Sequence, residues 1–589
     1  MNFLKNFFAS LLGSLTAFIL LFVILLMIVS ATASLVNTPS LGGKALSDNS
    51  VLNLDLKLPI VERPPVFDEI QNLFGLEEEF VGLPNILSAI HNAGENPKIK
   101  GIRLRSDFVS AGWSQTHNIR KALDSFKRKG KFIYAYGDFY SQKGYYIASV
   151  ADSIFLNPVG NLEFKGLASE VLYYKDFQDE YGLKMEVVRH GKYKSAVEPF
   201  LENEMSAENR YQITSLLNDL WSTLREEIAI SRTLSIETLD SLAGNSQISI
   251  PKDGLSSKLI DGLTYEDTFD EKIKDRLGLE KDAKLKKVSI KRINNSTKIY
   301  DAEITDRIAV VFAKGPILYG EGSESIIAQG VFVKTLEDLA KDDWVKAVVL
   351  RVDSPGGSAL TSELLWRTIE KVKTTKPVIV SMGDVAASGG YYIAAGADHI
   401  FADPLSITGS IGVFATLPNA KAFMNDLGIH AQFVETHPNA LGYSPYQNLS
   451  KGFENQLKKG IKNTYETFKV RVADGRSLSP QTVENIAQGR VWTGKQALEV
   501  GLVDKLGSLQ DAIAYAAEQA EIIDYNILEY PKFEENLENL LKGISPSLEV
   551  KPPVENVIPQ NILFQLKNNT KTAPQPYIQT LLPFELRIR

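Results

Sequence analysis

The residue best suited to nucleophilic chemistry is Ser388, which lies in the run Ala386-Ala387-Ser388-Gly389-Gly390. The pattern predicts a strand that ends before Ser388 and a helix that begins after it. A serine flanked by small residues has an approachable hydroxyl, and the N–H groups of an opening helical turn point toward developing negative charge. Ser388 is therefore a candidate nucleophile. In the alternative interpretation, this serine only caps the helix.

A second glycine pair, Gly356-Gly357, follows the predicted strand Val345–Val352. Glycine allows unusual backbone angles without a blocking Cβ, so this turn can bring another backbone N–H close to a reacting group. Together with the helix that begins after Ser388, the turn provides the donors of a candidate oxyanion hole.

A serine nucleophile also needs a base. The chain has no cysteine, which excludes a thiolate nucleophile, disulfides, zinc ribbons and iron–sulfur clusters held by this chain. It has six histidines, and no two of them have the spacing of a helical HExxH metal pair. We therefore expect a base other than the usual histidine.

The segment 189–200 offers three bases, namely Lys192, Lys194 and His190. A lysine can act as a general base where burial lowers its pKa toward neutrality. The alternative is that both lysines are ordinary surface residues. A histidine base normally has a carboxylate on its other ring nitrogen, and no sequence feature selects one here.

The elements that must position these residues come from an internal repeat. Residues 135–166 align without a gap with residues 381–412 at an offset of 246, which takes Gly137 to Gly383. The same offset aligns the upstream strand 99–105 with 345–351. The body of the chain therefore consists of two copies of one domain.

Each copy alternates β-branched runs with helical patterns, which predicts an α/β fold with a mostly parallel sheet. In the C-terminal copy the expected strands are Arg307–Ala313, Val345–Val352, Val378–Met382 and His399–Ala402, and the expected helices are Thr361–Val372 and Gly390–Ala397. Longer amphipathic helices are expected over Ser206–Ser231, with Ser206 as its N-cap, and over Phe453–Asp474.

The two copies differ where chemistry is expected. Ser388 of the C-terminal copy has Gln142 as its counterpart, whereas the lysines of the N-terminal copy align loosely with segment 434–445, which has no lysine. One copy thus has the serine and the other has the lysine.

The N-terminus predicts a membrane anchor. Residues 7–36 carry no charge, and about 20 apolar residues suffice to cross a bilayer. Lys5 weakly favours a cytoplasmic N-terminus and therefore an exported body. A cleaved signal peptide ending near Ala31-Thr32-Ala33 is the alternative.

The expected organisation is an anchor over 1–40, an N-terminal repeat over 41–300, a C-terminal repeat over 301–525 and a Pro/Asn-rich extension over 526–589. With 589 residues, 44% hydrophobic composition and a net charge of −7, the chain has an ordinary globular composition and lacks the excess positive charge typical of nucleic-acid binding.

Several motifs together resemble the signal peptide peptidase A (protease IV) family in its long, tandem-domain bacterial form. They are Ser354-Pro355-Gly356-Gly357, Met382-Gly383, residues 386–394 and residues 405–412. Residues 193–200 look like the lysine motif of that form, which favours Lys194 over Lys192. The resemblance implies Ser388 as nucleophile, Lys194 as general base, and Gly357 and Gly389 as oxyanion-hole donors. It also implies a Clp-protease/crotonase-like fold in each repeat.

The resemblance further implies a single-pass protein of the inner (cytoplasmic) membrane whose catalytic body faces the periplasm and assembles as a homotetramer. Its substrates would be signal peptides and other unfolded apolar peptides, with no cofactor and no metal. Two rival hypotheses remain open: a membrane-tethered scaffold whose dyad is vestigial, and other hydrolase or acyl-CoA chemistry on the same fold. An exported body argues against the acyl-CoA hypothesis, because CoA is a cytoplasmic cofactor.

Overall fold

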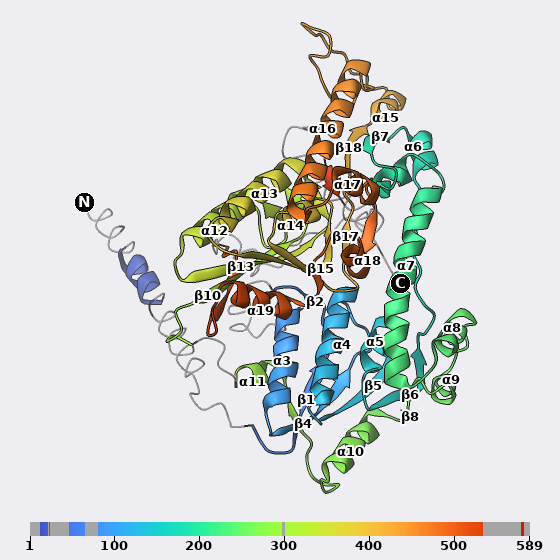
Figure 1. Cartoon of the computed structure of the whole chain (residues 1–589), viewed down its shortest axis with the longest axis vertical. Helices are drawn as coiled ribbons and strands as arrows, with labels where there is room; N and C mark the ends of the chain where they lie inside the picture. Colours follow the sequence, from blue (N-terminus) through green and yellow to red (C-terminus); the bar gives the residue numbers. More distant parts are fainter. Residues whose placement is uncertain are drawn as a thin grey trace.

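The computed structural model describes residues 7, 12–21, 23, 46–64, 80–296, 301–533 and 579–581 (Figure 1). The expected anchor over 1–40 lies mostly outside these residues. Among the helices in the described ranges, none is both long enough and apolar enough to span a membrane. Most of the expected extension, residues 534–578 and 582–589, also lies outside the described part.

The N-terminal repeat is built on a six-stranded sheet with the order β8-β6-β5-β4-β1-β9, in which every pair is parallel. Its strands are β1 (Ser50–Asp55), β4 (Ile99–Arg105), β5 (Phe132–Tyr140), β6 (Ser153–Leu162), β8 (Gly262–Leu263) and β9 (Lys286–Val288). Helices α3 (Leu83–Glu95), α4 (Trp113–Arg128) and α5 (Gln142–Ala148) connect them.

The C-terminal repeat repeats this plan with an eight-stranded sheet whose path is β19-β17-β15-β13-β10-β21. Its strands are β10 (Arg307–Lys314), β13 (Val345–Ser354), β15 (Val378–Ala387), β16 (His399–Ala402), β17 (Ile407–Gly409), β19 (Val491–Thr493), β20 (Lys505–Leu506) and β21 (Asn526–Tyr530). All pairs except β17–β19 are parallel, so the expected α/β fold with mostly parallel sheets is confirmed. Strand β21 continues this sheet past residue 525, where we placed the domain boundary.

The predicted helices are present, and they pack through the faces that their spacing indicates. They are α13 (Ala359–Lys373), α14 (Gly389–Ala394), α7 (Ala207–Arg232) and α16 (Lys451–Arg476). Ser206 caps α7 by accepting a hydrogen bond from Asn209 N. The apolar residues of α16 that recur every three or four positions are buried: Phe453, Leu457, Ile461, Tyr465, Phe468 and Val472.

The duplication extends to individual hydrogen bonds in the two cores. Tyr145 OH donates to Leu259 O at 2.9 Å, and its counterpart Tyr391 donates to Leu502 O at 2.8 Å. Each hydroxyl would otherwise be a buried polar group without compensation, so both copies preserve the pairing. The two repeats therefore share their packing as well as their order of elements.

A third sheet combines strands from both repeats, in the order β12-β11-β14-β22-β18-β7. Its members are β12 (Ile327–Ala328), β11 (Ile317–Leu318), β14 (Gly356–Ser358), β22 (Gln579–Leu581), β18 (Val413–Asn419) and β7 (Lys184–His190). Strand β7 of the N-terminal repeat pairs antiparallel with β18 of the C-terminal repeat along seven residue pairs, from Val413–His190 to Asn419–Lys184. Figure 1 shows these strands side by side, with α7 running past both repeats.

A buried histidine also joins the repeats. In α4, His117 contacts Asp403 with Nδ1 at 2.6 Å and Glu227 with Nε2 at 3.1 Å. Burial alone would lower the pKa of His117, but the two carboxylates outweigh burial and raise this pKa to about 10. The imidazolium is therefore charged at neutral pH and links α4, α7 and the loop after β16.

We predict that His117→Ala lowers the free energy of unfolding at pH 7 by about 3 kcal/mol, because Asp403 loses its buried charged partner. The pKa of the histidine is raised on folding from 6.5, so its stabilisation is complete below pH 6.5 and is lost as the pH rises through about 10. The difference between wild type and variant in urea unfolding should thus be smaller at pH 10 than at pH 7. His437→Ala, which changes an exposed histidine, is the control. If wild type and His117→Ala differed equally in free energy of unfolding at both pH values, the charged pair would be contradicted.

Candidate active site

Ser388 lies between the end of β15 at Ala387 and the start of α14 at Gly389, as the sequence predicts. Its backbone has φ 56° and ψ −114°, an unusual conformation for a residue with a Cβ. Its N–H donates to Gly409 O at 2.8 Å, which fixes this turn. The side chain makes no capping hydrogen bond to α14, so the interpretation of Ser388 as a simple helix cap is wrong.

The N-terminal repeat shows what the ordinary junction looks like. There Ser141 is the N-cap of α5 and accepts a hydrogen bond from Gly144 N, in an extended conformation with φ −65°. The residue aligned with Ser388 is Gln142, which is buried and accepts a hydrogen bond from Lys165 N through Oε1. The capping serine of the N-terminal repeat lies one position before the residue aligned with Ser388, and Ser388 instead has a positive φ. Its hydroxyl therefore makes no helix cap and can face another group.

That group is Lys194, which follows β7. Its Nζ lies 2.8 Å from Ser388 Oγ, 3.0 Å from Ser410 O and 2.9 Å from Ser410 Oγ. All three residues are completely buried. Burial lowers the pKa of Lys194 well below its ordinary value, and no carboxylate in the described part of the chain compensates for it.

The three contacts of Lys194 match the valence of a neutral amine. A neutral amine has two N–H bonds and one lone pair. The two N–H groups can be donated to the carbonyl and hydroxyl oxygens of Ser410, and the lone pair then faces the Ser388 hydroxyl. This arrangement can accept the Ser388 proton directly, as a general base requires.

Glycines make room for the lysine stem. Gly489 has φ 81°, and a Cβ built on it would lie 2.7 Å from the Cβ of Lys194. A Cβ on Gly412 would lie 3.1 Å from Lys194 Cδ. Gly489 N donates to Ile411 O at 2.8 Å, so this loop is tied to the segment that carries Ser410.

The residues after Lys194 are anchored to α7 by a buried polar network. Ser195 Oγ donates to Asn209 Oδ1 at 2.9 Å and accepts from Gln212 Nε2 at 2.8 Å. The buried Glu198 accepts from both the N–H and the hydroxyl of Ser206. These contacts hold the short 3₁₀ helix Ser195–Phe200 and thereby fix where the lysine emerges.

The competing bases lie elsewhere. Lys192 is exposed, and its ammonium lies over the ring of Tyr193. The ring of His190 packs against Tyr465 with ring centroids 4.5 Å apart. Of the three bases considered, Lys194 is the one that the structure brings to Ser388.

Of the two expected oxyanion donors, Gly389 follows Ser388 directly and Gly357 lies in a strand that contacts the helix beginning there. Gly389 is the first residue of α14, and the first N–H groups of a helix have no intrahelical acceptor. Gly357 lies in β14, which contacts α14. Its φ is 153°, and a Cβ there would lie 2.0 Å from Ile317 O, so the loop cannot take this path with a larger residue.

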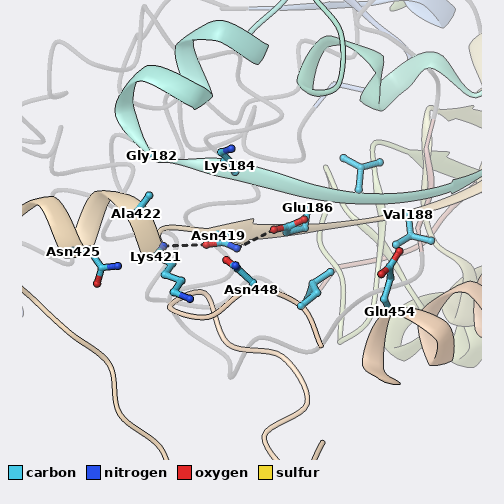
Figure 2. A pocket seen from close by; sticks show the side chains of 12 residues that line it. Gly182, Lys184, Glu186, Val188, Asn419, Lys421, Ala422, Asn425, Asn448 and Glu454 are labelled. Carbon is cyan, nitrogen blue, oxygen red and sulfur yellow. Dashed lines mark hydrogen bonds between the residues drawn. The ribbon is translucent and has the colours of Figure 1, made fainter. Parts of the chain in front are cut away.

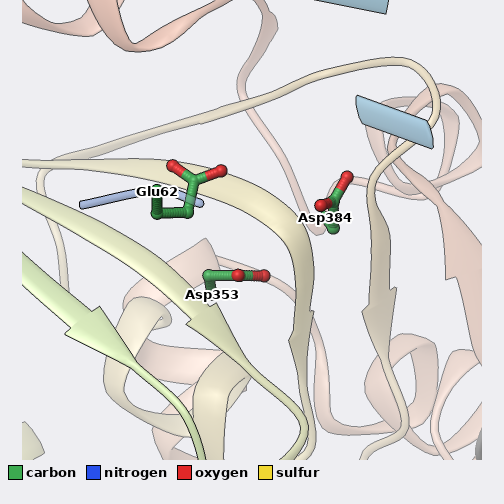
Figure 3. A group of neighbouring side chains, drawn as sticks. All are labelled: Glu62, Asp353 and Asp384. Carbon is green, nitrogen blue, oxygen red and sulfur yellow. The ribbon is translucent and has the colours of Figure 1, made fainter. Parts of the chain in front are cut away.

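One group of carboxylates has the proximity of a metal site. Oxygen atoms of Glu62, Asp353 and Asp384 lie within 4.8 Å of one another (Figure 3). Protein donors already occupy them: the Arg351 guanidinium binds Glu62 at 2.8 and 3.1 Å, and the N–H of Gln115 donates to Asp384. Burial, reinforced by the charge of Glu62, raises the pKa of Asp353 to about 6. These contacts make the group a link between the repeats.

A cavity of about 580 Å³ lies along residues 184–188 of β7 and the end of β18 at Asn419 (Figure 2). Its lining includes Lys184, Glu186, Asn419 and Lys421, and Asn419 Nδ2 donates to Glu186 Oε1 at 2.9 Å. None of the predicted site residues lines it, so the serine and lysine are brought together outside this cavity.

Comparison with known proteins agrees with this arrangement. Peptidase family S49 matches residues 125–280 and 370–523, more than half of the chain and one segment in each repeat. The chain belongs to peptidase family S49. It is a serine peptidase with two tandem S49 segments.

Three relatives align with most of the chain. It is 36% identical to Protease 4 of Haemophilus influenzae over 73% of this chain and 71% of that protein. It is 34% identical to Protease 4 of Salmonella typhi over 85% and 83% of the two chains. It is 31% identical to the chloroplastic serine protease SPPA of Arabidopsis thaliana over 83% and 73%.

Sequence reasoning overlooked Ser410, which contacts the lysine with both its carbonyl and its hydroxyl. Its φ is 53°, and its carbonyl and hydroxyl oxygens lie 3.0 and 2.9 Å from Nζ. Ser410 lies in the motif 405–412, but its role depends on a lysine more than 200 residues away along the chain. Asn209 and Gln212 were missed for the same reason, because only the folded chain brings them to Ser195.

We predict that Gly489→Ala lowers kcat by about 100-fold, because the new Cβ displaces Lys194 and misplaced catalytic groups lose rate on that scale. Gly501→Ala is a matched control: Gly501 has φ 79°, nearly the same as Gly489, but the nearest atom to its new Cβ is a Leu478 methyl at 3.4 Å. Both variants should have similar thermal midpoints, whereas only Gly489→Ala should lose peptidase activity. Equal activity in the two variants would contradict this account of the lysine stem.

Proposed function

We propose that this S49 peptidase is a membrane-anchored endopeptidase that degrades signal peptides and other apolar peptides with a dyad of Ser388 and Lys194. The observation that carries the dyad is the 2.8 Å contact between Nζ and Oγ in a fully buried setting. The signal-peptide substrates, the N-terminal anchor, the periplasmic location, the homotetramer and the Clp-protease/crotonase-like fold of each repeat rest on the family resemblance and stay predictions.

The proposed reaction begins with neutral Lys194. Its Nζ takes the proton of Ser388, and Oγ attacks the carbonyl carbon of the scissile peptide bond. Backbone N–H groups of Gly357 and Gly389 hold the tetrahedral oxyanion, and each such donor is worth about 3–4 kcal/mol of barrier. Lys194 then donates its proton to the leaving amine, and a water molecule, deprotonated by the same lysine, hydrolyses the acyl-enzyme.

Apolar, extended substrates suit the surroundings of this dyad. The serine and lysine are buried beside short strands of the mixed sheet, and Phe414 of β18 places its ring centroid 6.0 Å from Lys194 Nζ. A peptide that enters this setting must lose its hydration, which disfavours charged side chains. An unfolded apolar segment meets that requirement at the lowest cost.

We predict that Ser388→Ala and Lys194→Ala each abolish nearly all cleavage of an apolar peptide by the chain lacking residues 1–40. Removal of either member of a nucleophile–base pair typically lowers kcat by at least about 10³-fold. Lys192→Ala is the control, because this lysine is exposed and close in sequence; it should retain activity. Undiminished cleavage by either dyad variant would contradict that residue's role, and an inactive wild type would favour the scaffold hypothesis.

The pH dependence of kcat should report the lysine. Below its pKa Lys194 is an ammonium and cannot accept the Ser388 proton, so we expect kcat to rise with pH and to level off above a pKa that lies well below 10.5. Peptide turnover measured from pH 6 to 10 tests this expectation. A flat profile over that range would contradict lysine as the base.

A further inference from the structure

One buried side chain of α7, that of Gln212, contacts the chain on both sides of the proposed base. Gln212 is 1% exposed. Its Nε2 donates to Tyr193 O at 3.0 Å and to Ser195 Oγ at 2.8 Å. Tyr193 and Ser195 are the residues directly before and after Lys194. One amide group therefore holds both ends of the short segment from which the lysine side chain emerges.

The other end of the same amide reaches the C-terminal repeat. Gln212 Oε1 accepts a hydrogen bond from Val491 N at 3.4 Å, and α7 contacts β19, the strand that begins at Val491. A glutamine amide has a donor end and an acceptor end, and here each end faces a group of the matching kind. This side chain thus connects the lysine segment of one repeat to a strand of the other.

The strand that Gln212 contacts belongs to a row of backbone positions that leads to the nucleophile. Across the sheet, Val491 pairs with Gly409 of β17, and Gly409 pairs with Ala387 of β15. Ala387 is the last residue of β15 and directly precedes Ser388, whose N–H donates to Gly409 O. The glutamine therefore contacts both the segment that carries the base and the row of strands that carries the nucleophile.

Other contacts keep the two repeats together independently of this glutamine. Tyr193 N donates to Gln488 O at 2.9 Å, which ties the backbone before the lysine to the C-terminal repeat. Farther along α7, Ser215 Oγ accepts from Gln496 Nε2 at 3.3 Å. Loss of the Gln212 amide would therefore leave the repeats docked, and its main effect would fall on the path of the lysine segment.

We propose that Gln212 is a positioning residue that sets the placement of Lys194 Nζ relative to Ser388 Oγ, 2.8 Å away. This inference rests on the proposed function, because it takes Lys194 to be the base. The glutamine contacts the neighbours of the lysine and acts through it. A displacement of about 1 Å in such a pair costs about 100-fold in rate, so a small shift of the segment suffices for a measurable effect.

Gln212→Met in the full chain tests this role, because methionine has a similar length but neither end of the amide. We expect kcat for an apolar peptide to fall at least about tenfold with KM within about twofold, since the lysine moves while the peptide-binding surfaces stay in place. The rise of kcat with pH should also move to higher pH, because a displaced amine lies closer to water, which stabilises the ammonium. An unchanged kcat, or a rise that stays at the pH of the wild type, would overturn the proposal.

Gln178→Met is the matched control. Gln178 is also a buried glutamine whose amide joins two backbone groups, since it donates to Phe200 O at 2.8 Å and accepts from Met185 N at 2.6 Å. Both partners belong to the N-terminal repeat, and neither adjoins Lys194 in the sequence. The two variants should lose similar thermal stability, whereas only Gln212→Met should lose kcat. An equal loss of kcat in Gln178→Met would indicate a merely structural effect and would overturn the positioning role.

A double variant separates this proposal from the proposed dyad. The readout is the rate at which a fluorophosphonate labels Ser388, because this rate reports the reactivity of the nucleophile without peptide binding. We expect Lys194→Ala to slow labelling and the addition of Gln212→Met to slow it no further, since a residue that acts through the lysine then has nothing to position. A further fall of about tenfold in the double variant would overturn the positioning role and leave the dyad intact. Labelling of Lys194→Ala at the wild-type rate would contradict the dyad, and the inference that rests on it would fall as well.

Discussion

The structure depends on one constraint, the burial of a lysine amine beside a serine hydroxyl, with no carboxylate among the described residues to compensate. An ammonium in this position would exchange its hydration shell for contacts with only two serine residues, so burial favours the neutral amine. The surrounding residues then have to pair the two N–H groups and the lone pair of a neutral amine and to exclude water from it. Ser410, the glycines of the lysine stem and the mixed sheet serve these requirements.

The duplicated architecture explains how such a site can be assembled. Each repeat has its own mostly parallel sheet and core, but neither contains both reactive groups. The pairing of β7 with β18 carries the lysine out of the N-terminal repeat and into the C-terminal one. Docking of the repeats is thus a condition for the dyad, and buried ionic contacts at their boundary, His117 with Asp403 and Arg351 with Glu62, secure that docking. Such contacts specify one arrangement, because a displaced repeat would leave charges buried without partners.

The sequence predicted the features that depend on local pattern. Four strands (β10, β13, β15 and β16) and three helices (α13, α14 and α16) of the C-terminal repeat, the junction at Ser388 and the cap at Ser206 follow from β-branched runs, helical spacing and capping chemistry. The residues alone left the choice between Lys192 and Lys194 open. The two lysines lie two positions apart on one short segment, and only tertiary contacts determine which of them is buried. Ser410 and β22 were missed because each acquires its role from a partner far away in the sequence. A strand of three residues has too little intrinsic preference to be recognised without its neighbours.

The mixed sheet links the burial of the dyad to its reactivity. Ser388 and Lys194 have no exposed surface, and Phe414 of β18 places its ring centroid 6.0 Å from Lys194 Nζ. This low-polarity setting lowers the pKa of the lysine, because an ammonium there would lose its hydration. A change that admitted water to the amine would therefore raise the pKa of the base, so the packing of β7 against β18 matters for catalysis as well as for the docking of the repeats.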